Sequence, residues 1–423
     1  MSARETAADA IVIGAGLAGS ALAFELQKRG LTVIVLEALS AHALAASGNP
    51  AGIWMPHATA QLTSTTQFYL RSLRELLSDP LLAECRLPQR QNGAIQLAHS
   101  PASEKRLRSA LEYLPSDLAR WCSAAELSAI AGTHMACGGL FFPQAGMLYP
   151  RRLTELRLQG PRINVIYEQI VHSARWQPDA KTWRLGCQNG KHYESRYVLL
   201  AQASAVRSIS AAAWLPVIPV RGQLLYLQAG QALTELNCPV SYEGYISPCL
   251  PPSAERFQSP GDAAVCQVIG ATFEHWNTRT ELIPAQHQRL YEMARRTLPA
   301  LPKANVETNP GRVSFRSSSP DRFLLAGRLP HLESLQTSLD QNPHQMHAWL
   351  QRWPRVQAWP QTGISLAHAS RGILTSGLTA RLVVADLLDE QLSPADQQYL
   401  AAGQPTRYLQ RNLRRHGKLL PVE

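Results

Sequence analysis

Three glycines and one acidic residue near the N-terminus have the types and the spacing that bind a dinucleotide. Gly14, Gly16 and Gly19 form a Gly-x-Gly-x-x-Gly turn, and Glu37 follows eighteen residues after the last glycine. In such a turn the first glycine permits a tight bend, the second lets a pyrophosphate approach the backbone, and the third lets the following helix pack against the strand. The acid accepts hydrogen bonds from ribose hydroxyls. The pattern therefore predicts a dinucleotide site.

The flanking residues predict the elements that hold this turn. An apolar run over 11–13 predicts a strand before it, and a helix rich in small residues follows it and stops at Gly30. Residues 32–36 predict a second strand, which ends at Glu37. The helix N-terminus would direct free N–H groups and a positive dipole at the phosphates. Small residues also suit any close helix–strand packing, but the order of these elements favours the dinucleotide.

A second glycine-bearing loop precedes the last long apolar helix. Ser370, Arg371 and Gly372 lead into a segment that has Val383 and Leu387 on one helical face. Taken alone, this is typical of an ordinary core helix after a glycine turn. Together with the N-terminal turn it favours a flavin, because a helix N-terminus beside the isoalloxazine ring stabilises the negative charge of the reduced ring.

The composition is that of a globular protein, and the length predicts two intertwined domains. The 423 residues are 45% hydrophobic and 17% charged, and such a length exceeds one ordinary core. The seven cysteines form no close pair in the sequence and are odd in number, which favours reduced thiols and a cytoplasmic location. The apolar run over 10–24 is too short to cross a bilayer, so no membrane partner is expected.

The net charge of +10 admits two interpretations, a generically basic surface or an anionic partner, with nucleic acid ahead of membrane. A basic C-terminal tail over 404–420 bears on this choice. Five cations there have a spacing that puts them on one helical face: Arg407, Arg411, Arg414, Arg415 and Lys418. A solvated terminal helix and a phosphate-binding face are equally consistent with the spacing alone.

Helices and strands are expected along the rest of the chain. Helices are predicted over 65–78, 103–130, 151–159 and 285–300, and strands over 163–200 and 217–275, the latter as an antiparallel sheet beside a substrate chamber. Residues 330–360, rich in Gln, His, Pro and Trp, are predicted to form an irregular insertion. His344 and His347 lack a third ligand nearby, so no metal site is expected.

Several segments, in order along the chain, resemble one flavoprotein family. They are Ala46-Ser47-Gly48-Asn49, Gly139-Leu140-Phe141-Phe142-Pro143-Gln144-Ala145-Gly146, Arg221-Gly222-Gln223, Gly244-Tyr245-Ile246-Ser247-Pro248, Gly270-Ala271-Thr272-Phe273, Arg312-Val313-Ser314-Phe315-Arg316, Asp321 to Gly327, and Ser370-Arg371-Gly372. The chain resembles the FAD-dependent D-amino-acid oxidase/glycine oxidase family over residues 10–418. Within this family it resembles the oxidoreductase half of the bifunctional tRNA 5-methylaminomethyl-2-thiouridine biosynthesis proteins.

Two features depart from that resemblance. The methyltransferase half that normally precedes this half is missing from the sequence, so the chain is expected to be a stand-alone oxidoreductase or an excised domain. The insertion over 330–360 has no counterpart among the matched segments.

The resemblance implies an α/β fold in which a Rossmann-like FAD-binding domain, of the glutathione-reductase type, is interleaved with an antiparallel-sheet substrate domain, as in D-amino-acid oxidase. The FAD-binding domain is expected over 1–85, 140–215 and 321–423, and the substrate domain over 86–139 and 216–320. The implied cofactor is FAD. The residues expected to hold it are Gly14, Gly16, Gly19, Glu37, Ser47, Gly48, Asn49, Ser370, Arg371 and Gly372.

The resemblance also implies a reaction, oxidation of the 5-carboxymethylaminomethyl group of wobble (2-thio)uridine in tRNA to 5-aminomethyl, with release of glyoxylate. Arg316 matches the carboxylate-binding arginine of glycine-oxidase-like enzymes, although its position alone suits a surface charge at a strand end. Tyr245 is expected to add a hydroxyl donor, and Arg221 is the next candidate for the carboxylate. The expected partner is tRNA, bound by the basic tail, and a separate methyltransferase is expected to act on the product.

Two alternatives stay open at this point. One is a flavin oxidase or dehydrogenase of a free amino acid, such as glycine, sarcosine or a D-amino acid. The other is a non-catalytic dinucleotide-binding or RNA-binding protein that retains the fold. Purified protein is expected to be yellow, and this colour separates the flavin-binding from the non-flavin interpretations. Bleaching of the flavin by hypomodified tRNA, but not by free amino acids, would exclude the first.

Overall fold

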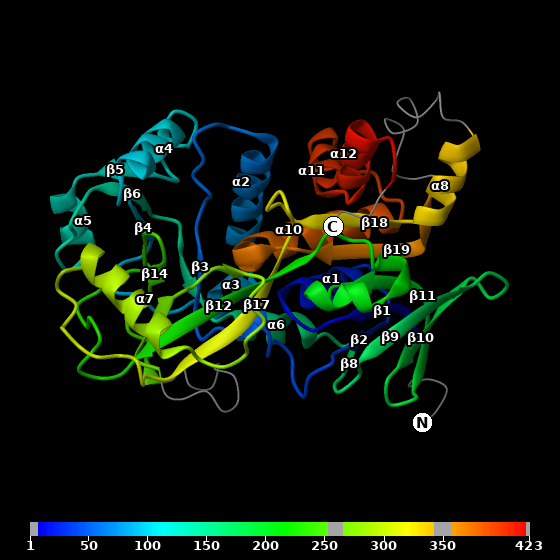
Figure 1. The fold of residues 1–423 in the computed structure, drawn as a ribbon, viewed down its shortest axis with the longest axis horizontal. Helices are drawn as coiled ribbons and strands as arrows, with labels where there is room; N and C mark the ends of the chain where they lie inside the picture. Colours follow the sequence, from blue (N-terminus) through cyan, green and yellow to red (C-terminus); the bar gives the residue numbers. More distant parts are fainter. Residues whose placement is uncertain (1–6, 253–264, 342–356, 420–423) are drawn as a thin grey trace.

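Two large sheets organise the chain. The computed structural model describes residues 7–252, 265–341 and 357–419. Figure 1 shows the sheets side by side, with the N-terminal strand β1 in the right-hand half and strands β4 to β6 in the left-hand half. This arrangement agrees with the predicted α/β fold with a separate antiparallel sheet.

The first sheet contains the dinucleotide turn. Its strands are, in spatial order, β18 (Leu325–Pro330), β19 (Ala358–Leu366), β11 (His192–Leu200), β1 (Ala7–Ile13), β2 (Val33–Leu36) and β8 (Ile163–Ile166), with β10 (Thr182–Cys187) and β9 (Val171–Gln177) continuing from β11. Strands β19, β11, β1, β2 and β8 pair in parallel with one another, whereas β18 is antiparallel to β19 and β10 is antiparallel to β11. The apolar runs of the central strands β1 and β2 are buried on both faces, as is typical of parallel sheets.

Alternate residues of these strands enter two different cores. Val12 and Val35 pack into one cluster, while Ile13 and Leu36 pack into the other. Helices that contribute to the first cluster are α1 (Leu17–Lys28), α2 (Ser64–Leu77), α3 (Leu81–Cys85), α6 (Pro150–Leu158), α10 (Gly372–Leu387) and α11 (Pro394–Gly403). The second cluster lies under β9, β10, α8 (Leu332–Gln341) and α12 (Thr406–His416). The sheet is thus covered on both sides.

The second sheet is largely antiparallel. Its strands are, in spatial order, β16 (Glu274–His275), β12 (Ile218–Leu227), β15 (Gln267–Gly270), β14 (Tyr245–Ile246), β13 (Val240–Ser241), β4 (Ala94–Leu97), β6 (Gly139–Phe142) and β5 (Arg120–Cys122), with β17 (Gly311–Ser318) paired to β12. Helices α4 (Pro101–Leu111), α5 (Ala124–Ala131) and α7 (Pro284–Thr297) pack on it. A small sheet joins β3 (Gly52–Trp54) to β7 (Gly146–Leu148).

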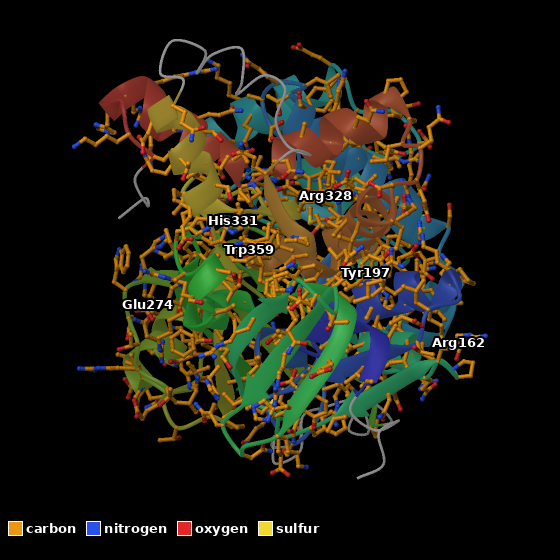
Figure 2. The ribbon with its side chains drawn as sticks, turned by 90° about the vertical axis from the view of Figure 1, so that its right-hand side faces the viewer. Arg162, Tyr197, Glu274, Arg328, His331 and Trp359 are labelled. Atoms are coloured by element: carbon orange, nitrogen blue, oxygen red, sulfur yellow. The ribbon has the colours of Figure 1, made fainter. Side chains whose placement is uncertain are left out.

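Three local predictions differ from the structure. The helix expected over 103–130 is two helices, α4 and α5, separated by strand β5. Strand β6 lies in the second sheet, so the domain boundary expected at 139/140 falls inside it. The segment over 330–360 is not wholly irregular, because it contains α8 and the start of β19. His331 stacks on Trp359, with ring centroids 3.9 Å apart (Figure 2). Residues 342–356, with His344 and His347, lie outside the described residues.

None of the helices in the described part of the chain combines the length and the apolar character needed to cross a bilayer.

Candidate active site

The dinucleotide turn has room for glycine only at two of its positions. Gly14 has a φ of +103°, and a Cβ atom there would lie 2.8 Å from the carbonyl oxygen of Ala201. A Cβ at Gly19 would lie 1.8 Å from the carbonyl oxygen of Gly14, because α1 passes very close to the turn. Such approaches exclude every other residue. The turn is therefore closely packed against the start of α1 and against Ala201, and it requires glycine at both positions.

Two side chains already contact the N–H groups of this turn. Glu37 lies at the end of β2, and its Oε2 accepts a hydrogen bond from the Ala15 N–H at 2.6 Å, while Oε1 accepts one from the Leu39 N–H at 3.0 Å. Ser47 Oγ accepts a hydrogen bond from the Leu17 N–H at 3.0 Å. Ser47 belongs to the 3₁₀ turn Ala46–Gly48, so the structure brings this distant segment to the first turn of α1.

The second glycine loop also reaches this place. The 3₁₀ turn Ala369–Arg371 leads directly into α10 at Gly372. A Cβ at Gly372 would lie 3.4 Å from Cδ1 of Leu17, the first residue of α1. The N-termini of α1 and α10 therefore meet, and their dipoles and free N–H groups combine in one anion-favouring region.

Two buried polar side chains near the turn, Asn49 and Gln202, have polar atoms that no described residue pairs with. Asn49 Oδ1 and both side-chain polar atoms of Gln202 are buried, and none has a hydrogen-bond partner among the described residues. The Gln202 Cα lies 3.2 Å from the place of a Cβ at Gly14. Buried polar groups without partners are uncommon unless a ligand or water satisfies them. The residues around the turn, called the cofactor cradle below (Gly14, Gly16, Gly19, Glu37, Asn49 and Gln202), therefore suit a dinucleotide with polar edges. Gln202 was not predicted, because no motif marks it in the sequence.

Arg371 contacts two aromatic rings, and no carboxylate of the described residues is paired with it. Its Nη2 lies 3.0 Å from Nδ1 and 3.2 Å from Nε2 of His57, and its Cζ lies 5.0 Å from the Tyr69 ring centroid. A donor nearly equidistant from both nitrogens of one imidazole lies over the ring face, so the guanidinium stacks on His57. Burial, together with the charges of Arg371 and Arg106, lowers the pKa of His57 to about 3, so this ring is neutral.

A second histidine fixes the start of α10 from inside. His368 Nε2 lies 3.0 Å from Ser365 Oγ, and its Nδ1 lies 2.7 Å from Thr375 Oγ1. Burial lowers its pKa to about 4. A neutral imidazole can accept one of these hydrogen bonds and donate the other. This network orients the 3₁₀ turn that carries Ser370 and Arg371. Neither His57 nor His368 was predicted, since both depend on tertiary contacts.

Arg316 and Tyr245 come together on one face of the second sheet. Burial raises the pKa of Tyr245 to about 12, and the positive charge of Arg316 partly opposes this rise. Arg316 donates from Nη1 to the Thr272 carbonyl oxygen at 3.0 Å, and a Cβ at Gly222 would stand only 2.4 Å from the same nitrogen. Burial lowers the pKa of the guanidinium. Among the described residues no carboxylate pairs with it, so it lacks the counter-ion that a buried cation normally has.

Strand β17 connects this face to the cofactor cradle. Arg312 lies on the same face as Arg316, because alternate residues of a strand share a face. Its Nη2 donates to the carbonyl oxygens of Leu44 and, at 3.1 Å, of Ala45, just before the turn that carries Ser47. Four residues along a strand span about 13 Å. The guanidinium of Arg316 is thus on the surface that continues from the cradle.

Arg221 is not part of this surface, so its prediction as a carboxylate ligand is wrong. It is fully buried, and its register partner in β17 is Phe315, which places it on the opposite face from Arg316. Its Nη1 is paired with Glu274 Oε2 at 2.7 Å, and its other donors reach Gln223 and the carbonyl oxygens of Arg279 and Glu281. Four of its five N–H groups are thus bound, and the side chain is 0% exposed, so it cannot meet a substrate.

The basic tail is only partly available for a partner. Arg407 is bonded to both carboxylate oxygens of Asp321, at 2.8 and 3.0 Å, and to the carbonyl oxygens of Phe323 and Leu324. It therefore anchors α12, and its predicted contact with RNA lacks free donors. Arg411, Arg414 and Arg415 are exposed on α12, while Lys418 is exposed beyond the helix end at Gly417.

The cysteines are free thiols in the described residues, although two lie closer than the sequence suggests. Cys249 and Cys266 have their Sγ atoms 3.7 Å apart. No group of three His, Cys, Asp or Glu side chains in residues 7–252, 265–341 and 357–419 could hold a metal ion.

Comparison with known families gives one match that covers most of the chain. The model of the FAD dependent oxidoreductase family matches residues 9–386. Among curated proteins, the tRNA 5-methylaminomethyl-2-thiouridine biosynthesis bifunctional protein MnmC of Hydrogenovibrio crunogenus is 34% identical over 394 residues, which cover 91% of this chain and 56% of that protein. MnmC of Chromobacterium violaceum is 29% identical over 426 residues, covering 96% and 60%. The chain thus spans little more than half the length of these relatives.

Solved structures show the same fold at low sequence identity. Glycine oxidase from Geobacillus kaustophilus superposes with a TM-score of 0.68 at 17% identity, covering 92% of this chain and 96% of that one. L-proline dehydrogenase from P. horikoshii has a TM-score of 0.69 at 13% identity, covering 96% and 99%. At these identities the likeness establishes the architecture alone.

Proposed function

The chain belongs to the FAD dependent oxidoreductase family, and from this premise we propose that it oxidises the 5-carboxymethylaminomethyl group of wobble uridine in tRNA. The products would be 5-aminomethyluridine in the tRNA and glyoxylate. The names of the MnmC relatives support tRNA as the substrate. The observation that carries the proposal is Arg316, a half-buried cation without a counter-ion among the described residues, on the surface beside the cofactor cradle.

The residues around the dinucleotide turn would hold FAD. The N–H groups at the start of α1 would bind the pyrophosphate, and Glu37 would exchange its present N–H partners for ribose hydroxyls. Asn49 and Gln202 offer buried polar atoms that lack partners among the described residues. Ser370, Arg371 and Gly372, at the N-terminus of α10, would lie against the ring. When bound, FAD supplies a two-electron acceptor for the hydride that leaves the glycine methylene of the substrate.

Arg316 would bind the carboxylate of the substrate arm. Its planar fork can donate two parallel hydrogen bonds to the two oxygens, which fixes the plane of the carboxylate. Tyr245 stays protonated at neutral pH because burial raises its pKa to about 12, so its hydroxyl can donate a further hydrogen bond. Together these two groups would fix the distance from the carboxylate to the reacting C–H bond.

The same surroundings favour the neutral form of the substrate amine. No described carboxylate pairs with Arg316, and a cation nearby disfavours an ammonium group. The neutral amine holds the lone pair that forms the C=N bond as the hydride leaves, and the amine proton goes to solvent. Water then adds to the imine, the C–N bond breaks, and glyoxylate and the 5-aminomethyl base separate.

The exposed cations of α12 would bind the tRNA backbone. Arg411, Arg414 and Arg415 are exposed on α12 and Lys418 lies just beyond it, whereas Arg407 is bound by Asp321, which also lies 3.9 Å from Arg411 Nη2. An array of cations on one helical face suits a row of phosphates.

Anaerobic mixing with tRNA that carries the 5-carboxymethylaminomethyl group tests this proposal. We expect the yellow colour to bleach and one glyoxylate to form per flavin, while tRNA with the mature modification leaves the spectrum unchanged. Glycine, sarcosine and D-amino acids serve as the comparison. If millimolar free amino acids bleach the flavin and the tRNA does not, the protein is a free amino-acid oxidase instead.

A further inference from the structure

Exposed apolar side chains gather in one segment of the second sheet. Of the six large apolar residues that are exposed among the described residues, three lie between β15 and α7: Phe273 at 47%, Trp276 at 76% and Leu282 at 40%. A single exposed apolar residue is ordinary, but a group of them indicates a contact surface. His275, between the two aromatic residues, is exposed as well.

This segment lies directly beside the carboxylate site. The Phe273 ring centroid is 5.7 Å from the Cζ atom of Arg316, and Arg316 donates to the carbonyl oxygen of the preceding residue, Thr272. The rings of Phe273 and His275 meet edge to face, with centroids 5.1 Å apart. Val220 is the register partner of both His275 and Arg316, so these two side chains share a face of the sheet.

Hydrogen bonds from the opposite face of the sheet hold this segment in place. Arg221 binds the carbonyl oxygens of Arg279 and Glu281, at 2.8 and 2.7 Å, and the side chain of Glu274. Glu274 also accepts from Gln286 of α7 at 3.0 Å. Figure 2 shows Glu274 near the outer edge of the molecule, where the segment meets solvent. The exposed rings are therefore displayed on a fixed backbone.

We propose that Phe273, His275 and Trp276 form a stacking platform for unpaired bases of the tRNA anticodon, an inference that rests on the proposed function. Phe273 would stack on the modified uridine itself, and Trp276 on a neighbouring base. Single-stranded RNA is typically recognised by aromatic rings on which splayed bases stack. Glycine and sarcosine have no ring system and would make no use of such a surface.

The spacing of Phe273 and Arg316 agrees with the substrate. Four bonds separate the uracil ring from the carboxylate carbon in a 5-carboxymethylaminomethyl group, and an extended arm of four bonds spans about 5 Å. This length is close to the 5.7 Å between the Phe273 ring centroid and the Cζ atom of Arg316, which lies over that ring. Arg279 and Glu281 are both exposed in the same segment, so their charges offset each other, while Glu274 is bound by Arg221 on the other face.

Three substrates separate the roles of the two rings. They are modified tRNA, the free modified nucleoside, and sarcosine, which has the carboxylate and the amine but no base. Removing a base–aromatic stack costs about five- to one-hundred-fold. We expect Trp276→Leu to raise KM by this factor for tRNA alone. We expect Phe273→Leu to raise KM for tRNA and for the nucleoside, so that the preference for both over sarcosine falls. Ile170→Ala, which removes an equally exposed side chain on another part of the chain, is the matched control.

A binding measurement tests the platform independently of turnover. An anticodon stem-loop RNA should quench part of the tryptophan fluorescence of the FAD-loaded enzyme, and Trp276→Leu should abolish that part and weaken binding. Trp276→Phe should restore the affinity. Equal affinity and equal quenching in Trp276→Leu and the wild type would overturn the platform. Quenching that depends on Trp276, without oxidation of any tRNA, would instead retain the platform and refute the proposed reaction.

Discussion

Replacing Arg316 by methionine is the sharpest test of the carboxylate site. The guanidinium lies flat against Gly222, has no described carboxylate as a partner, and donates to only one carbonyl oxygen of the described residues, that of Thr272. Its remaining N–H groups are available to a ligand. A hydrogen bond to a charged group contributes about 1.5–3 kcal/mol. We therefore expect kcat/KM for the modified tRNA to fall about ten- to one-hundred-fold in Arg316→Met.

The stability of the same variant should change in the opposite direction. Burial lowers the pKa of Arg316, which means that the fold disfavours its charged form. Since no described counter-ion offsets this cost, Arg316→Met should unfold at the same temperature as the wild type or at a higher one. A residue that served only to stabilise the sheet would give a lower melting temperature.

Two further variants at this position complete the test. Arg316→Lys keeps the charge but loses the planar fork, so its kcat/KM should lie between those of the wild type and the methionine variant. Gly222→Ala keeps Arg316 but adds a Cβ 2.4 Å from Nη1, so the guanidinium must move and activity should fall. The assay is anaerobic flavin reduction, with tRNA binding measured in parallel. Wild-type reduction rates in Arg316→Met would refute the assignment.

Three other predictions concern the cofactor, the tail and pH. Gly16→Val should yield colourless protein, because a branched side chain would occupy the path of the pyrophosphate. A Cβ at this position would already lie 3.0 Å from Ser47 Oγ. Recovery of yellow protein that is fully loaded with FAD would contradict this prediction. Replacing Arg411, Arg414 and Arg415 with Gln should weaken tRNA binding and leave the flavin spectrum unchanged. The slope of the logarithm of the binding constant against the logarithm of the salt concentration should fall by roughly 0.7–0.9 for each phosphate that is no longer bound. An unaltered slope would show that these cations are merely solvated. The pKa of His368, lowered from 6.5 to about 4, makes the fold prefer neutral imidazole, so its stabilising effect is complete above pH 6.5 and declines between pH 6.5 and 4. His368 should contribute about 1.4 kcal/mol per pH unit to the loss measured by urea unfolding, and His368→Gln should remove this contribution; parallel curves for both proteins would exclude this residue.

The parts of the site that depend on neighbouring residues could be predicted from the sequence. The glycines and Glu37 act within one strand–turn–helix–strand unit, so their spacing alone defines their positions. Arg316 came from the resemblance to a family, and the structure adds the reason for its suitability, which is that no described carboxylate serves as its counter-ion.

The parts that depend on distant partners could not be predicted. Arg221 and Arg316 both lie on strands, and only the register of β12 with β17 reveals that they face opposite sides. Helical spacing groups Arg407 with Arg411, but Asp321, which is far away in the sequence, binds Arg407. Helix α8 was missed because the composition of the whole 330–360 segment obscured the apolar pair Leu335 and Leu339.

The contacts of Arg221 have a consequence for how the substrate range of this fold can change. Two of its partners are backbone carbonyl oxygens, at Arg279 and Glu281, which any amino acid would supply. The position of this segment therefore depends on its backbone rather than on most of its own side chains. Mutations between residues 275 and 282 can alter the surface proposed to meet a substrate while the hydrogen bonds from Arg221 remain. Replacing this segment by another sequence is therefore a practical route to enzymes with new substrates.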